Sequence, residues 1–339
     1  MIITLMFCVF VSFLFKYISK KLNLSVVIGL IASGIILGSP FLKKIILGPN
    51  IDIILKLGNL GFITLMFLAG MEISWCLLYE ERKEASVVAF FAAAIPTIGG
   101  FLIFFALGFS IFTSLAVGIS MGITAEATKA RVLLELNKLD TRVGSLMMGA
   151  GILDDVFGLL MFGLVIFLFS GEVVTTEFFN VVAAISVFFL GILVHKALGR
   201  EHHLVTVIEK LLLLLLIPFF FIGMGIHFSF QSLVLDPLLL FGIITIAILG
   251  KIGGSLVAKP FTNLSWKQLY LVGWGMNSRG AVELGIAFLA LRAGLITEHI
   301  YSSLIIMALI TTLLFPFMLR RTVKNNPDIM GDVSGCFKE

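Results

Sequence analysis

Long apolar segments follow one another along nearly the whole chain, separated by short breaks that contain charged residues, glycine or proline. Most segments have the length of about 20 residues that a helix needs to cross a hydrocarbon layer of about 30 Å. The pattern therefore predicts an all-α polytopic membrane protein with about eleven transmembrane helices. The expected helices span residues 1–20, 24–42, 52–74, 86–108, 111–134, 143–170, 177–197, 207–230, 235–259, 267–293 and 299–320.

The composition agrees with this pattern and leaves no room for a separate soluble domain. Of the 339 residues, 59% are hydrophobic and 13% are charged, and the mean hydropathy is +1.13, which excludes an ordinary water-soluble protein. Residues 1–320 are predicted to form one transmembrane domain, with residues 321–339 as a short cytoplasmic tail. The first apolar stretch precedes its basic residues, unlike a cleaved signal peptide, so we expect it to remain as the first helix.

The distribution of Lys and Arg predicts the orientation in the membrane. Basic residues gather in the loops after the first, third, fifth, seventh and ninth helices and in the tail, with Lys43, Lys44 and Lys56 as exceptions. Basic loops accumulate on the cytoplasmic side, so we expect the N-terminus outside and the C-terminus inside. The formal charge of +4 is scattered and does not indicate a nucleic acid partner. The three cysteines are widely spaced and indicate neither a disulfide framework nor a zinc site.

Asp154 and Asp155 interrupt the apolar run GSLMMGAGILDDVFGLLMFGLVIFLF within the helix expected at 143–170. A charge at the centre of a spanning helix costs about 2.5–3.5 kcal/mol, so such residues are functional candidates. Adjacent helical residues point about 100° apart, so one carboxylate can face a water-filled cavity while the other faces a protein partner. The alternative is that the pair caps a broken helix.

Lys251 is a second charged residue at membrane depth, late in the helix expected at 235–259. A buried lysine needs an anionic partner or loses its proton, and Asp154 or Asp155 is the nearest candidate by depth. The alternative is a lysine that extends its ammonium group to the membrane surface near the helix end.

Two further segments are too polar for continuous apolar helices. The first, GISMGITAEATKARVL, contains Thr124, Glu126, Thr128 and Lys129, and the second, VGWGMNSRGAVELGIAFLAL, contains Asn277, Ser278, Arg279 and Glu283. Both patterns predict broken helices, and paired breaks in the two halves of a chain are typical of inverted-repeat transporters. For the first segment, Lys129 and Arg131 at the cytoplasmic end of the helix are an alternative.

Taken together, these motifs resemble the monovalent cation/proton antiporters of the sodium/proton exchanger superfamily, in the branch that carries an Asp-Asp pair. The similarity is strongest over 124–162, TAEATKARVLLELNKLDTRVGSLMMGAGILDDVFGLLMF, and includes LNLSVVIGLIASGIILG, LGNLGFITLMFLAGMEI, GKIGG and GMNSRGAVELGIA. The resemblance implies an inverted-repeat antiporter fold with a moving core, a scaffold that makes a homodimer, and an elevator-like motion. It implies no enzymatic activity and no cofactor.

The resemblance also implies roles for particular residues. Asp155 would bind the cation and the proton competitively, and Asp154 would assist by pairing with Lys251. Thr124 and Thr128 would lie close to these acids, where the first broken helix crosses the second.

In the second broken helix the resemblance implies that Arg279, Glu283 and Asn277 stabilise the core. Three departures from the family accompany these matches. Only one helix lies between 171 and 200 where the family commonly has three, so two scaffold crossings are expected to be missing. Ser278 stands where the family often has proline, and Glu126 with Lys129 stands where neutral residues are usual; these two could form an ion pair or alter ion selectivity.

The sequence therefore predicts exchange of a monovalent cation, with Na⁺ favoured over K⁺ or Li⁺, for protons, in a prokaryotic cell membrane and with net charge movement. Proton and cation would compete for one carboxylate, and the neutral loaded site would cross the membrane more easily than the empty one. A cation channel and a transport-inactive sensor or partner subunit are alternatives. An intramembrane enzyme is disfavoured. An aspartyl protease needs acids on two separate helices, whereas Asp154 and Asp155 are adjacent, and the HExxH motif of a metalloprotease is absent.

Overall fold

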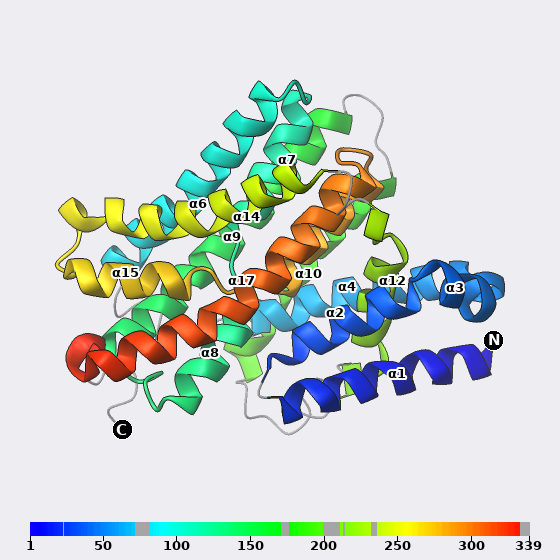
Figure 1. Cartoon of the computed structure of the whole chain (residues 1–339), viewed down its shortest axis with the longest axis horizontal. Helices are drawn as coiled ribbons and strands as arrows, with labels where there is room; N and C mark the ends of the chain where they lie inside the picture. The colour runs from blue at the N-terminus through cyan, green and yellow to red at the C-terminus, as the bar shows by residue number, and fades with distance from the viewer. Residues whose placement is uncertain are drawn as a thin grey trace. The chain divides into compact units, whose positions relative to one another are not determined.

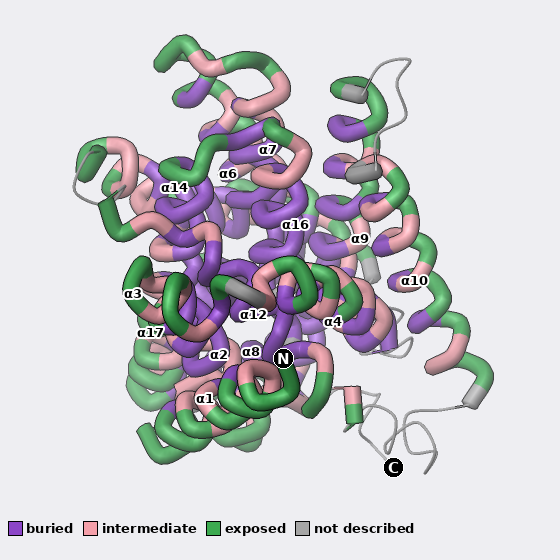
Figure 2. The backbone as a smooth tube through the Cα atoms, turned by 90° about the vertical axis from the view of Figure 1, so that its right-hand side faces the viewer, coloured by how far each residue is buried: buried purple, intermediate pink, exposed green. Residues whose placement is uncertain are grey.

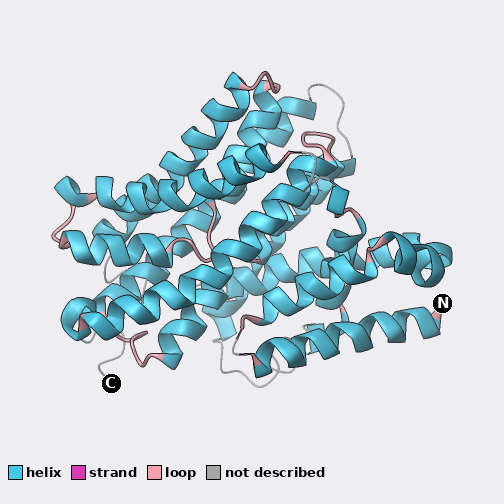
Figure 3. Cartoon of the chain, viewed as in Figure 1, coloured by secondary structure: helices cyan, strands magenta, loops and turns pink. Residues whose placement is uncertain are grey.

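Residues 1–22, 24–71, 82–170, 176–198, 211–212, 214–231 and 236–332 are described in the computed structural model of the chain. Every regular element among them is a helix (Figure 3), as the apolar pattern predicts. The chain forms two units, Met1–Ile73 with Phe179–Ser232, and Ser74–Phe178 with Leu233–Glu339. We call them unit 1 and unit 2.

The helices are named by their position along the chain. Unit 1 contains α1 (Ile2–Lys21), α2 (Val26–Leu37), α3 (Pro40–Leu42), a π-helical turn (Lys43–Leu47), a 3-10 turn (Gly48–Asn50), α4 (Ile51–Met71), most of α10 (Thr176–Leu198) and α12 (Ile217–Ile226). Unit 2 contains α6 (Arg82–Ala106), α7 (Ile111–Gly122), α8 (Glu126–Glu135), α9 (Arg142–Ser170), α14 (Pro237–Val257), a 3-10 turn (Lys259–Phe261), α15 (Trp266–Gly275), α16 (Ala281–Arg292), α17 (Glu298–Asn325) and a last 3-10 turn (Pro327–Met330).

Seven of the described helices are long and apolar enough to cross a membrane, namely α1, α4, α6, α9, α10, α14 and α17. A bent pair, α2 with α3 and the π-helical turn, raises the number to eight. The helices α7 and α12 are apolar but shorter. Together with the composition, these spans identify an integral membrane protein.

The helix expected at 24–42 is not continuous, and this part of the prediction is wrong. After Leu37 the chain bends by 62° before α3 and the π-helical turn. The bend falls at Gly38 and Ser39, directly before Pro40. The proline ring disfavours helical backbone in the residue before it, so α2 ends before Ser39.

In unit 1, α2 packs against α12 through two glycines. A side chain at Gly34 would meet the carbonyl group of Phe221, and one at Gly225 would meet the backbone of Gly34. Small residues at these positions let the two helices approach closely. Lys43 donates a hydrogen bond of 3.0 Å to the carbonyl oxygen of Ile226, the last residue of α12. This contact at a helix C-terminus gives one of the exceptional lysines outside the expected basic loops a structural role.

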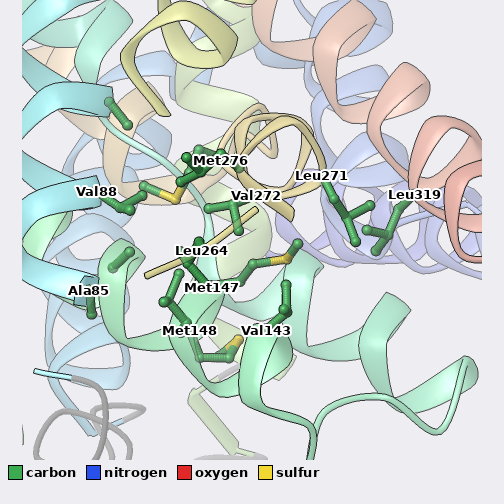
Figure 4. Close-up of a cluster of buried hydrophobic side chains, with 14 of the residues drawn as sticks. Ala85, Val88, Val143, Met147, Met148, Leu264, Leu271, Val272, Met276 and Leu319 are labelled. Atoms are coloured by element: carbon green, nitrogen blue, oxygen red, sulfur yellow. The ribbon is translucent and has the colours of Figure 1, made fainter. Parts of the chain in front are cut away.

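In unit 2, α6 packs against α7, α9 and α14, and α14 also packs against α15 and α17 (Figure 1). Buried side chains of α6, α9 and α15 meet in an apolar cluster that includes Val88, Met147 and Val272 (Figure 4). Figure 2 shows α16 buried along nearly its whole length, whereas much of α10 is exposed. Exposed apolar faces of this kind are expected on helices that contact lipid.

The last helix extends beyond its predicted end at residue 320. It continues to Asn325, and in the 3-10 turn that follows, Ile329 and Met330 are buried in the apolar cluster of unit 2. Part of the segment expected as a tail is therefore packed against unit 2. Residues 333–339 lie outside the described part, as do Cys76 and Cys336, and Cys8 is a buried free thiol.

Candidate functional site

The candidate site lies within unit 2, where two broken helices cross. The helix expected at 111–134 is interrupted between α7 and α8, and the helix expected at 267–293 is interrupted between α15 and α16. Ala125 donates its N–H to the carbonyl oxygen of Ser278 at 2.9 Å, and the Ser278 hydroxyl donates to the carbonyl oxygen of Ala125 at 2.9 Å. The two irregular segments therefore satisfy each other's backbone groups, which lipid cannot do.

The Ser278 hydroxyl also donates to the carbonyl oxygen of Gly275 at 3.1 Å. A proline, which the resemblance makes usual here, has neither this hydroxyl nor a backbone donor. The serine hydroxyl thus supplies one contact across the crossing, to Ala125, and one to the end of α15, at Gly275.

Asp154 lies on α9 at this crossing and is buried. Its Oδ2 atom accepts a hydrogen bond of 3.1 Å from the Thr124 hydroxyl and lies 2.7 Å from Nζ of Lys251. Its Oδ1 atom is buried without a hydrogen-bond partner among the described residues. The structure thus joins three residues that the sequence singled out, from α9, from the first crossing segment and from α14.

Lys251 is fully buried, so the alternative of a lysine that reaches the membrane surface is wrong. Besides its ion pair with Asp154, it donates a hydrogen bond to the carbonyl oxygen of Gly122, the last residue of α7. The ammonium group therefore neutralises a carboxylate and caps a helix C-terminus, where the helix dipole attracts positive charge.

Asp155 is also buried, with 6% of its surface exposed, and Thr128 is buried on the first turn of α8. The 100° step between adjacent residues on α9 directs the Asp155 side chain away from that of Asp154. Lys251 forms an ion pair with Asp154, and Asp155 follows Asp154 directly on α9.

A cavity of about 10 Å³ adjoins Asp154 between α6, α7 and α9. It is lined by Ala93, Thr97, Ile119, Gly122, Ile123, Asp154, Phe157, Gly158 and Met161. Its volume is close to the minimum that holds one water molecule. The space beside the carboxylate therefore has room for one molecule or ion about the size of water.

Arg279 belongs to the second crossing segment and is buried. Its guanidinium group donates to the carbonyl oxygens of Ile123 at 2.5 Å and Met121 at 2.8 Å, which are left without helical partners where α7 ends. It lies 3.4 Å from a carboxylate oxygen of Glu283, on the first turn of α16. Its backbone exchanges hydrogen bonds of 3.2 and 3.1 Å with the Thr312 hydroxyl of α17.

Asn277 stabilises the end of α15. Its amide nitrogen donates to the carbonyl oxygens of Gly273 at 3.0 Å and Ile248 at 3.4 Å. Of the residues that the resemblance assigned to the core, Arg279 and Asn277 thus act on carbonyl groups of broken or neighbouring helices, and Glu283 accompanies Arg279.

Glu126 and Lys129, whose role the sequence left open, form an ion pair of 2.8 Å with 7% and 0% of their side-chain surfaces exposed. Lys129 is therefore enclosed by protein and is not a solvent-exposed residue of this helix. Arg131, two residues further, is 37% exposed and pairs with Glu135.

Two residues at the site were not predicted from the sequence. Thr312 lies in the run LIIMALITTLLFPF, where two adjacent hydroxyl side chains in an apolar helix were an available signal. Gly151, in GAGILDD, lies against the Glu126–Lys129 pair, and a side chain there would meet both partners. A glycine one turn before the acids was the available signal.

The charges around the crossing do not balance. Around the crossing, the buried acids of the described residues are Glu126, Asp154, Asp155 and Glu283, and the buried basic residues are Lys129, Lys251 and Arg279. Glu84 is also buried, but it lies on α6 and pairs with Arg142. With ordinary ionisation, four carboxylates face three cations, so one monovalent cation or one proton makes the cluster formally neutral. Such a cluster can bind either ligand in exchange for the other.

Comparison with known proteins agrees with this chemistry. The profile of the family described as "Sodium/hydrogen exchanger, transmembrane" matches residues 9–174 and 160–325. A Na(+)/H(+) antiporter of Enterococcus hirae is 25% identical, with 91% of this chain and 94% of the relative aligned. The Na(+)/H(+)-K(+) antiporter GerN of Bacillus cereus is 23% identical, with 90% and 92% aligned.

The fold agrees as well. The structure of the sodium proton antiporter MjNhaP1 from Methanocaldococcus jannaschii at pH 8 matches 97% of this chain and 98% of that chain, with 16% identity and a TM-score of 0.68. The alignment with the Enterococcus hirae protein extends over 365 residues, more than the 339 of this chain. Parts of that relative therefore have no counterpart here. Matches over most of its length show that the chain belongs to the transmembrane sodium/hydrogen exchanger family, a family of cation/proton antiporters.

Proposed function

We propose that the protein exchanges a monovalent cation, with Na⁺ favoured, for protons at Asp154 and Asp155. The observation that carries the proposal is the buried ion pair of Asp154 and Lys251 at the crossing of two broken helices, with Asp155 beside it on α9. The names of the Enterococcus hirae and Bacillus cereus relatives support Na⁺, and that of the latter also supports K⁺. The channel and sensor hypotheses are not favoured by these relatives.

In the proposed cycle, Asp155 binds either the cation or a proton, and Asp154 assists. Thr124 and Lys251 hold one oxygen of Asp154, while its other oxygen has no hydrogen-bond partner among the described residues. A site that carries an uncompensated negative charge costs several kcal/mol to move through the hydrocarbon layer, whereas a loaded site is neutral. Only the loaded site then crosses, and exchange follows without another energy source.

The decisive measurement is cation-driven proton movement in sealed proteoliposomes, with Na⁺, Li⁺ and K⁺ added in turn. Asp155→Asn should abolish it while the protein still inserts, because the amide cannot trade a proton for a cation. Asp52→Asn is a matched control, since Asp52 is an exposed acid on α4. Exchange by Asp155→Asn with unchanged apparent cation affinity contradicts the assignment.

We infer eleven crossings by counting each broken pair and α12 as a crossing in addition to the long spans. The seven long spans, the bent pair of α2 and α3, the two broken pairs and α12 together make this number. In this interpretation unit 2, with both broken helices, is the moving core of an inverted-repeat fold. Unit 1 is the scaffold, which forms a homodimer and has two crossings fewer than the scaffold of its relatives. An odd number places the two termini on opposite sides, and the Lys and Arg residues of the loops favour the C-terminus on the cytoplasmic side. Reporters fused to both ends test this, and finding them on the same side contradicts it.

The exchange is proposed to move net charge. Two acids and Lys251 meet at the site, so cation binding can release a second proton from Asp154 or Lys251. One net charge is worth about 2.3 kcal/mol per 100 mV, so a valinomycin-set potential should drive exchange without an ion gradient. Lys251→Gln combined with Asp154→Asn should retain some exchange and lose this response. Wild-type exchange that is indifferent to the potential contradicts the two-proton cycle.

A further inference from the structure

The buried ion pair of Glu126 and Lys129 has no part in the proposed cycle, although it lies at the same crossing. Glu126 is the first residue of α8 and follows Thr124, the hydrogen-bond donor to Asp154, by two positions. Its carboxylate lies 2.8 Å from Nζ of Lys129, which also donates to the carbonyl oxygen of Met147 on α9 at 2.8 Å. Ionised pairs at membrane depth are rare, and those that persist mark ion pathways.

Gly151 places this pair relative to the two aspartates. A side chain at Gly151 would meet both the Glu126 carboxylate and the Lys129 ammonium group, so the pair lies directly against α9 at this position. Gly151 precedes Asp154 by three residues and Asp155 by four, so each of the two aspartates neighbours Gly151 on the helix surface. The Glu126–Lys129 pair therefore lies one helical turn from the aspartates.

The two buried lysines have the same kind of surroundings. Lys251 contacts the Asp154 carboxylate and the carbonyl oxygen of Gly122, and Lys129 contacts the Glu126 carboxylate and the carbonyl oxygen of Met147. Each ammonium group thus has a second acceptor in the backbone. Such a lysine can release its carboxylate to another cation without losing all of its hydrogen bonds.

We propose that Glu126 is a second cation-attracting carboxylate of the transport pathway and that Lys129 is its exchangeable counter-ion. An alkali cation that approaches the aspartates along this face of α9 competes with the Lys129 ammonium group for Glu126. The pair thereby sets the cation affinity and selectivity of the Asp154–Asp155 site. This inference rests on the proposed antiport function and adds a specificity-determining pair to it.

Opposite charge changes at this pair separate an electrostatic role from a structural one. Lys129→Met removes the ammonium group that competes with the cation for the Glu126 carboxylate. It should therefore lower the KM for Na⁺ in proteoliposomes by about tenfold. Glu126→Gln leaves the ammonium group to repel the cation and should raise the KM by a similar factor. The double variant should lie between the two, with an altered ratio of Na⁺ to K⁺ affinity.

The matched control is Arg131→Gln combined with Glu135→Gln, which removes the exposed ion pair of the same helix. It should leave the KM for each cation unchanged. Thermal stabilisation of the purified protein by Na⁺, Li⁺ and K⁺ gives a second measure, which requires binding but not transport. The midpoint of that stabilisation should shift in the same directions as the KM.

Shifts of both single variants in the same direction, or a loss of stability at unchanged KM, overturn the inference and leave the pair as a structural link between α8 and α9. If the single variants do not fold, the double variant decides, because it buries no uncompensated charge. An altered selectivity ratio then supports the inference, and a wild-type ratio overturns it. A wild-type protein without cation-driven proton movement contradicts the proposed function, and the binding midpoints still test Glu126.

Discussion

The two broken helices of unit 2 are joined by the hydrogen bonds between Ala125 and Ser278. Their first halves, α7 and α15, differ in the side chains that cap their C-terminal ends. The C-terminal end of α7 is held by charged side chains from other elements, namely Lys251 of α14 and Arg279 of the second crossing segment. The C-terminal end of α15 is held by neutral side chains that follow it directly, Asn277 and Ser278.

This difference determines which broken helix responds to charge at the site. Lys251 binds Asp154 and the end of α7 together, so any cation or proton that changes the Asp154–Lys251 contact also changes the capping of α7. The side chains that cap α15 are neutral, so they do not change charge when a proton or a cation binds. We therefore expect α7 and α8 to follow the loading of the site, and α15 and α16 to serve as the fixed side of the crossing.

Removal of Arg279 should have the largest effect on this arrangement. Arg279→Met leaves the carbonyl oxygens of Met121 and Ile123 without donors and buries the Glu283 carboxylate without its cation. Breaking a buried pair costs about 3–5 kcal/mol. We expect little folded protein in detergent, measured by size-exclusion chromatography and thermal melting. Arg292→Met, at the partly exposed end of α16, is the control, and a wild-type melting temperature for Arg279→Met contradicts the capping role.

A side chain at Gly151 should have a smaller effect, limited to the α7–α8 side. Gly151→Ala places a Cβ atom against the Glu126 and Lys129 side chains, and such overpacking costs about 1–3 kcal/mol. Gly253→Ala on α14 meets nothing within 4 Å. It should be neutral or stabilise by up to about 1 kcal/mol through helix propensity. Melting temperatures that change equally in the two variants contradict the close contact at Gly151.

The apolar pattern and the charges within it predicted much of this site. Asp154, Lys251 and Arg279 stand out because each is a charge inside a run of apolar residues, and charge in lipid has few explanations. Both interrupted helices were predicted for the same reason. Periodicity locates such residues along the chain but does not say what they touch.

The contacts that explain the site were less accessible, because they join distant segments. Arg279 reaches a carbonyl group of α7 that is 158 residues away in the sequence. Its acceptors are backbone oxygens, which every residue has, so no residue type marks them. The same holds for Lys129 and the carbonyl oxygen of Met147. The bend before Pro40 had a local signal in the proline itself, whereas the contact of Lys43 with the end of α12 had none.

The smallest expected effects come from two threonines that hold the crossing segments from opposite sides. The Thr312 hydroxyl exchanges hydrogen bonds with the backbone of Arg279, and the Thr124 hydroxyl donates to Asp154. Thr312→Val and Thr124→Val keep the side-chain shape and should each cost about 1 kcal/mol of stability.

Only Thr124 contacts a group that is proposed to change its charge state. Thr124→Val should therefore also change the KM for Na⁺ by several-fold, because a donor to the charged carboxylate favours that form. Thr312→Val should melt at a lower temperature with its KM unchanged. If both variants change the KM alike, the two broken helices respond to loading together, and the division into a responsive and a fixed side is wrong.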